Sequence, residues 1–187
     1  MKRRISVDDF ARLVHPSDPQ ISPDGRYVAF TVVRPNLDEN KYIHEIWVVD
    51  SESGEEVATL SGEGDSSPRW DHCSRRLIFV SRRGFKEDEK GAALYLYNLR
   101  GEPRLLLKMK WGVYLANWIS DTLVGFVSPV PVRKVDEDED YVDIRDLPPW
   151  FDGRGFVDEF REQLFICLLY TSPSPRDLST SRMPSSA

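Results

Sequence analysis

The segment PQISPDGRYVAFTVV at residues 19–33 decides the fold, because it returns later in the chain. PRWDHCSRRLIFVSR at 68–82 aligns with it without a gap, so that Arg26 matches Arg75 at an offset of 49 residues. A third copy, ANWISDTLVGFVS at 116–128, has lost one turn residue. A repeat of this length predicts a fold built from stacked copies of one structural unit.

A second strand-like segment follows each copy. HEIWVVDSESGEEVATL at 44–60 matches AALYLYNLRGEPRLLL at 92–107, with Trp47 aligned to Tyr95, and QLFI at 163–166 is a third copy of EIWV. Turn signals separate these segments: the Pro, Asp and Gly of SPDG favour a tight turn, and SGE and RGE mark the last hairpin. Each unit therefore predicts four short β-strands.

The apolar pattern defines the fold class. YVAFTVV and RLIFVS are apolar at nearly every position, which predicts sheets that are covered on both faces. Four antiparallel strands in about 40–50 residues are typical of propeller blades. We predict an all-β fold, a partial β-propeller of about three four-stranded antiparallel blades with the third incomplete, and a short amino-terminal helix. A β-sandwich would explain the turns but not the long repeat.

The repeat also gives the expected boundaries. Residues 1–18 are expected to form the amino-terminal helix and lead-in, and residues 19–166 the propeller part. The blades are expected near 19–66, 67–113 and 114–166.

Two local features refine this prediction. A helix is expected only at 6–14, where Ser6 would cap it with Asp9 three residues on. The second copy has WDHCSR where the first has ISPDGR, which predicts a weaker turn in the second blade.

Composition excludes several classes of partner. A net charge of −6 argues against a nucleic-acid or anionic-membrane partner. Cys73 and Cys167 give no disulfide framework, which fits a reducing, cytoplasmic location. The basic MKRR is followed by the polar ISVDDF, so we expect no signal peptide. The longest apolar run, LFICLLY, is far shorter than the roughly 20 residues that span a bilayer.

In the order of these features, the chain resembles the amino-terminal propeller of the prolyl oligopeptidase family, and within it the acylaminoacyl-peptidase branch. ISPDGRYVAFTV, EIWVVD, RRLIFVSRR and LYLYNLRGEPRLL look like its blades. The most specific stretch is DIRDLPPWFDGRGFVDEFREQLFI at 143–166, because the family carries a similar Leu-Pro-aromatic and Gly-x-Gly-aromatic segment before a blade strand.

The resemblance implies a substrate-gating propeller part of a serine peptidase that hydrolyses short peptides. The implied partners are a carboxy-terminal α/β-hydrolase domain, which carries the Ser, Asp and His, and short peptide substrates; a homo-oligomer stays open. The chain contains no G-x-S-x-G, so we expect no catalytic, cofactor-binding or metal-binding residue in it, no cofactor and no activity of its own. The alternative is a non-catalytic propeller scaffold of the translocation-protein type.

Four residues are of types that serve in catalysis or metal binding, but we interpret each of them as part of the fold only. His72 and Cys73 are adjacent, and neighbours in a turn point apart and lack a third orienting group. His15 and His44 are isolated, with no second ligand at metal-binding spacing.

The acidic run DEDED at 136–140 belongs to a long insertion at 129–162. An EF-hand loop starting at the run would need glycine where Tyr141 stands, so we interpret the run as a solvated insertion that could contact substrate or a partner. DGRGF at 152–156 opens no helix and is interpreted as a tight turn, with Arg154 a weak candidate for contacting a carboxylate.

Residues 167–187, CLLYTSPSPRDLSTSRMPSSA, break the repeat. Back-translation of CLLYTSPSPRD and SRMPSSA gives DNA that resembles the two ends of a transposase-type sequencing adapter, in one reading frame and in the correct order. We therefore interpret 167–187 as a non-native, disordered tail, and expect the propeller to be truncated at residue 166.

Overall fold

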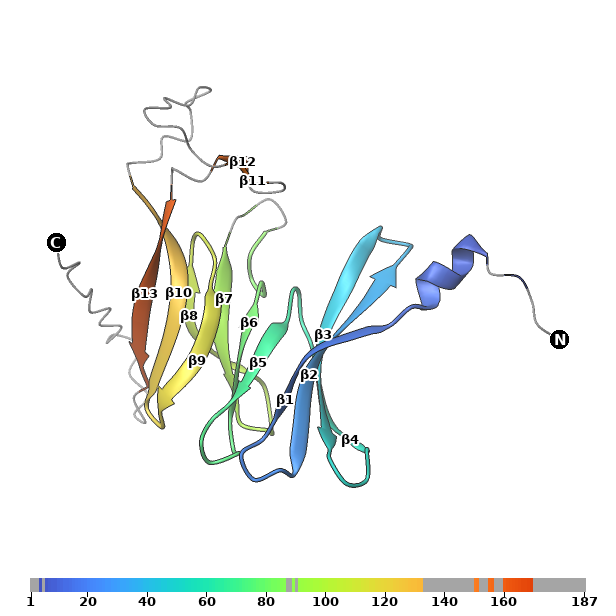
Figure 1. The fold of residues 1–187 in the computed structure, drawn as a ribbon, viewed down its shortest axis with the longest axis horizontal. Helices are drawn as coiled ribbons and strands as arrows, with labels where there is room; N and C mark the ends of the chain where they lie inside the picture. Colours follow the sequence, from blue (N-terminus) through green and yellow to red (C-terminus); the bar gives the residue numbers. More distant parts are fainter. Residues whose placement is uncertain are drawn as a thin grey trace.

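The computed structural model describes residues 4, 6–86, 89, 91–132, 150–151, 155–156 and 160–169. Three antiparallel sheets stand side by side in the order of the chain, and the amino-terminal segment extends away from them (Figure 1). The first strands of successive sheets contact each other, so that β1 lies beside β5 and β5 beside β9. This arrangement confirms the predicted partial propeller.

Each sheet is formed by one copy of the repeat. The first sheet contains, in order, β1 (His15–Ile21), β2 (Tyr27–Asn36), β3 (Lys41–Asp50) and β4 (Glu56–Ser61). The second contains, in order, β5 (Ser66–Trp70), β6 (Leu77–Ser81), β7 (Ala92–Tyr97) and β8 (Arg104–Met109). The third contains β9 (Tyr114–Ser120), β10 (Leu123–Pro131) and β13 (Phe160–Leu168), with β10 in the middle. A separate hairpin pairs β11 (Trp150–Phe151) with β12 (Gly155–Phe156).

One aromatic pair recurs in every sheet. In each case a phenylalanine on the second strand lies directly opposite an aromatic residue on the next strand of the sheet. Such cross-strand pairs fix the register of the two strands. The pairs are Phe30–Trp47, Phe79–Tyr95 and Phe126–Phe165, with ring centroids 6.3, 5.7 and 5.4 Å apart.

The core lies in two seams between sheets, so the middle sheet is buried on both faces. This explains why its strands are apolar at almost every position. The first seam packs Ala29, Ile46, Val48 and Leu60 of the first sheet with Trp70, Leu77, Phe79 and Tyr97 of the second. The second seam packs Ile78, Leu94, Leu96 and Leu107 of the second sheet with Ala116, Trp118, Val124 and Phe126 of the third.

Strand β13 continues beyond the expected boundary at residue 166. Cys167 pairs with Val124 and is buried in the second seam, and the Leu169 N–H donates to the Thr122 carbonyl at 2.7 Å. Leu168, between them, is partly exposed, which is the alternation of a strand. The expected disorder is therefore corrected for 167–169, because three apolar residues fit the strand; residues 170–187 lie outside the described part.

The amino-terminal helix is shorter and tighter than predicted. It is a 3₁₀ helix over Val7–Arg12, and the Ser6 N–H donates to the Asp9 carboxylate at 2.9 Å, as the sequence suggested. Phe10, Leu13 and Val14 are exposed instead of forming a buried face. The helix itself nevertheless lies against β2.

The turn of the second blade is closed by residues that differ from those of the first blade. Asp71 is buried and accepts hydrogen bonds from the Arg75 N–H at 2.8 Å, the Arg76 N–H at 3.1 Å and the Arg76 Nε at 2.7 Å. Ser74 takes the left-handed conformation, with a φ of 58°, that Gly25 has in the first blade at 75°. One carboxylate thus supplies the acceptors that close this turn.

Candidate functional site: the loop rim and the inner strands

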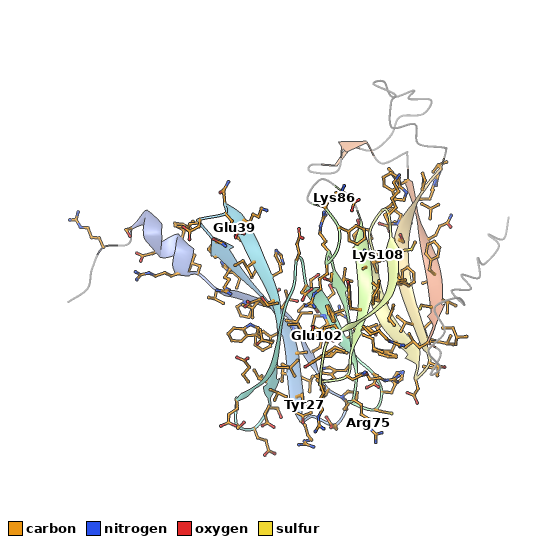
Figure 2. The ribbon with its side chains drawn as sticks, turned by 180° about the vertical axis from the view of Figure 1, so that it is seen from behind. Tyr27, Glu39, Arg75, Lys86, Glu102 and Lys108 are labelled. Carbon is orange, nitrogen blue, oxygen red and sulfur yellow. The ribbon has the colours of Figure 1, made fainter. Side chains whose placement is uncertain are left out.

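The connections between strands separate into two ends of the molecule. At one end, the turn rim, the chain reverses through short turns at 22–26, 51–55, 71–76, 98–103 and 121–122. At the other, the loop rim, lie the connections 37–40, 62–65 and 110–113, and there β6 leads towards β7 and β10 towards β13. Lys86 and Lys108 lie at the loop rim, and Tyr27 and Arg75 at the turn rim (Figure 2). Long loops carry function more often than tight turns, so the loop rim is the candidate functional surface.

The inner strands carry a polar cluster that joins two blades. Asp18 on β1 accepts a hydrogen bond from Gln20 Nε2 at 3.0 Å and forms an ion pair with Arg69 Nη1 on β5 at 2.7 Å. The Asp18 and Arg69 side chains are 32% and 24% exposed, so the pair is partly shielded from water. Partial shielding makes an ion pair stronger than one on the open surface.

A β-bulge at the same place in each inner strand shapes this surface. The pairing of the first and second strands shifts by one residue in all three sheets. At the shift that the three sheets share, one non-glycine residue has a positive φ: Asp18 at 50°, Ser67 at 56° and Leu115 at 48°. A bulge bends a strand and changes the direction of its side chains, and bulges are common beside functional sites. Aspartate tolerates this conformation better than serine or leucine, and the three residue types share no signal that would have predicted the bulge from the sequence.

A tryptophan joins each blade to the preceding one. Trp70 Nε1 donates to the Gln20 carbonyl, and Trp118 Nε1 donates to the Arg69 carbonyl, both at 3.0 Å. Both indoles are buried in seams, where an unpaired N–H would be costly. Because the acceptors lie at equivalent positions of β1 and β5, the two bonds fix successive inner strands in the same relative position.

A buried carboxylate stabilises the loop rim of the first blade. Glu45 on β3 accepts hydrogen bonds from Arg34 Nη2 at 2.9 Å, Trp47 Nε1 at 3.2 Å and Ser61 Oγ at 3.1 Å. Burial raises the pKa of Glu45, but the bonds from Arg34, Trp47 and Ser61 together lower it further, so its net pKa lies below the usual value. The carboxylate therefore stays ionised in the folded chain.

This lowered pKa predicts a pH-dependent stability. Because the folded pKa of Glu45 is below the unfolded one, its contribution is present above the ordinary value of 4.5 and is lost as the pH falls through the folded pKa. In the full-length protein, meaning the whole polypeptide of which this chain spans part, Glu45→Gln is expected to cost about 1–2 kcal/mol near neutral pH. Urea unfolding at a series of pH values measures this difference, which should shrink on acidification; a difference that stays constant would contradict the assignment.

A second buried carboxylate serves the second blade. Asp65 is fully buried in the connection 62–65. Its carboxylate forms an ion pair with Arg83 Nη2 and accepts a hydrogen bond from Arg83 Nε at 3.1 Å. The Arg83 guanidinium also lies 5.6 Å from the Phe79 ring centroid and 5.8 Å from that of Tyr95. This bidentate pair ties the loop rim to the aromatic pair of the second sheet.

The structure does not bring His15, His44, His72 and Cys73 together into one site. His72 and Cys73 lie in the 71–76 turn, where Cys73 Sγ lies 4.0 Å from the Asp121 carboxylate. His15 on β1 and His44 on β3 both lie opposite Val33 of β2. Two strand spacings, together roughly 10 Å, therefore separate the two histidines. A shared metal ligand would need a much closer approach. The described residues contain no group of three His, Cys, Asp or Glu that could hold a metal ion.

The insertion is described only in part. Trp150 pairs with Phe156 and Phe151 pairs with Gly155, while residues 152–154 of the predicted DGRGF turn lie outside the described residues. The acidic run 136–140, Asp143 and Arg154 lie outside the described residues. Across the described part of the chain, no helix has the length and apolar character needed to cross a membrane.

Comparisons with known proteins point in one direction. The "Uncharacterized peptidase YuxL" of Bacillus subtilis (strain 168) is 30% identical over 179 residues, which covers 89% of this chain and 26% of that protein. The Pyrococcus horikoshii acylaminoacyl peptidase superposes with a TM-score of 0.73 at 22% identity, covering 94% of this chain and 26% of that one. The β-propeller domain of the Trilobed protease from Pyrococcus furiosus gives 0.52 at 14% identity, covering 95% and 59%. No family model matches the sequence.

The likenesses differ in what they establish. The solved structures are below the identity that carries more than a fold, so they show the propeller architecture. The chain spans about a quarter of the length of the curated peptidase that it matches. The repeat, the three blades and these likenesses together show that the chain is part of a β-propeller whose sequence is similar to that of a bacterial peptidase.

Proposed function

We propose that this segment is a substrate-gating part of a cytoplasmic serine peptidase that hydrolyses short peptides. The full-length protein would carry the Ser, His and Asp on an α/β-hydrolase domain, and the propeller would control which peptides reach them. The observation that supports this proposal most is that the inner strands of the first two blades carry polar side chains, which join the blades through the Asp18–Arg69 ion pair.

The gate would work by keeping the blades together. The Trp70 and Trp118 indoles and the Asp18–Arg69 pair hold successive inner strands at fixed positions. A folded or long chain could not pass between blades held in this way, whereas a short peptide can enter through a narrow opening. Selection by size then needs no chemical recognition from the propeller.

Loosening the inner strands tests the proposal. Arg69→Ala in the full-length protein removes the ion pair with Asp18 and leaves the indole bonds in place. We expect kcat/KM for peptides of about 30 residues to rise at least about threefold relative to a dipeptide anilide, because the opening between the first two blades becomes easier to widen. Arg75→Ala is the matched control, since Arg75 is an exposed arginine at the turn rim of the same blade.

The dependence of kcat/KM on peptide length decides between the outcomes. An Arg69→Ala protein with the same length profile as the wild type would overturn the gating role. A full-length protein that hydrolyses no peptide would overturn the peptidase assignment and favour a non-catalytic scaffold.

A further inference from the structure

The Asp18 carboxylate holds two other side chains of the inner strands in place. Asp18 Oδ1 accepts a hydrogen bond from Gln20 Nε2 at 3.0 Å, and Asp18 Oδ2 accepts one from Arg69 Nη1 at 2.7 Å. We call Asp18, Gln20 and Arg69 the inner-strand cluster. Because both bonds end on one carboxylate, the Gln20 amide and the Arg69 guanidinium lie side by side between the first two blades.

Arg69 keeps three N–H groups for a ligand. Nη1 also donates to the Pro68 carbonyl at 2.7 Å, so both of its hydrogens are used and the plane of the guanidinium is fixed. The described residues supply no acceptor to the Nε hydrogen or to the two Nη2 hydrogens. Among these same residues, Thr31 Oγ1 is the only buried side-chain nitrogen or oxygen without a partner, so the unused edge of Arg69 reaches solvent.

Gln20 keeps an acceptor beside these donors. Its Nε2 is bound to Asp18, and no donor of the described chain reaches its Oε1. The Gln20 backbone is also fixed, since its carbonyl accepts the Trp70 indole bond at 3.0 Å. An acceptor and a set of donors are thus oriented before any ligand arrives, which lowers the entropy cost of binding.

The matching positions of the second and third blades hold other side chains. Ser67 stands where Asp18 does, and Asn117 stands where Arg69 does. The Asn117 Oδ1 accepts a hydrogen bond from the Trp118 N–H of its own strand at 2.9 Å. Because the indole bond joins the blades at both places, the repeat alone does not explain the inner-strand cluster.

The charge around the cluster favours a neutral ligand. Apart from His15 at the start of β1, the only ionisable side chains of β1, β5 and β9 are those of Asp18 and Arg69, which neutralise each other. Asp65, directly before β5, is buried and paired with Arg83. A polar group without net charge, such as a peptide main chain, therefore matches the cluster better than an anion does.

We propose that the inner-strand cluster docks the main chain of an extended peptide, with Arg69 donating to the carbonyl of one residue and Gln20 accepting the N–H of the same residue. A residue in an extended chain presents both groups on one side, as it does in an antiparallel pair. Asp18 is the positioning residue, because it orients the donor and the acceptor. The inference rests on the proposed function, since it states how a peptide that has passed the gate is held.

Binding of an amide and of its ester counterpart to the full-length protein tests the proposal without hydrolysis. The protein is first treated with a serine-directed sulfonyl fluoride. Fluorescence anisotropy then compares a labelled hexamer of alanine with a hexamer of lactic acid that carries the same label and the same blocked ends. The ester lacks every internal N–H and has weaker carbonyl acceptors. We expect the wild-type protein to bind the ester at least about threefold more weakly, because it cannot donate to Gln20.

Variants assign this difference to Gln20. Gln20→Met removes the acceptor, keeps a similar volume and leaves the Asp18–Arg69 ion pair in place. We expect the ratio of the ester and amide dissociation constants to fall at least about threefold in Gln20→Met. Asn117→Met, at the matching position of the third blade, is the control and should change the ratio less than about twofold.

Three results would overturn the docking site. The first is an unchanged ratio in Gln20→Met, and the second is an equal fall in Gln20→Met and Asn117→Met. The third is equal binding of the two hexamers by the wild-type protein, a result that requires no variant to fold. The gate is measured with Arg69→Ala and peptides of different length, so the two proposals fail separately.

Discussion

Replacing Phe79 with alanine in the full-length protein is expected to lower the free energy of unfolding of the propeller by about 3–5 kcal/mol. Phe79 is fully buried, stacks on Tyr95 and packs in the seam between the first two sheets. Its removal would leave a cavity that two rigid sheets cannot close. A loss of this size is a large part of the roughly 5–15 kcal/mol that stabilises a typical domain.

Urea unfolding followed by tryptophan fluorescence measures the effect. Leu105→Ala is the matched control, because Leu105 lies on β8 of the same sheet with 43% of its surface exposed. We expect this control to cost less than about 1 kcal/mol. Similar losses in both variants would show that Phe79 does not occupy a closely packed seam.

Residues 1–169 produced alone are expected to lack a cooperative unfolding transition. The outer faces of the first and third sheets expose apolar side chains that a neighbouring blade would cover in a longer propeller, such as Ile21, Ile119 and Leu164 at 68%, 53% and 59%. A repeat unit depends on its neighbours to bury such faces. We expect the isolated segment to bind a hydrophobic dye and to aggregate, as incompletely packed states do.

Calorimetry of the isolated segment checks this expectation against the full-length protein. A sharp and reversible transition, with the segment monomeric by analytical ultracentrifugation, would contradict it. The two seams would then be sufficient to stabilise three sheets without further blades.

The sequence predicted the repeating parts of the structure, because these parts depend on the pattern of apolar residues along each strand and on the spacing between the copies of the repeat. The alignment of Trp47 with Tyr95 placed both on the third strand of a sheet, and the structure puts each opposite a phenylalanine of the second strand. Apolar residues at nearly every position of the middle sheet indicated burial on both faces, and two seams provide it.

The sequence did not predict features that depend on one local conformation or one long-range bond. The bulges at Asp18, Ser67 and Leu115 involve three unrelated residue types, so backbone pairing and not composition determines them. Asp71 replaces a serine of the repeat and closes its turn through contacts that appear only once Arg76 folds back on it. The loop rim became evident only when connections that are distant in sequence were placed at one end of the described sheets.

An experimental structure of the full-length protein tests the central claim, that identical indole bonds join successive blades of one repeat. The account predicts that Trp70 Nε1 donates to the Gln20 carbonyl and Trp118 Nε1 to the Arg69 carbonyl, each near 3.0 Å. Both bonds should bring an inner strand against the preceding one. Indoles that point to solvent, or that bind unrelated acceptors in sheets of different topology, would contradict it.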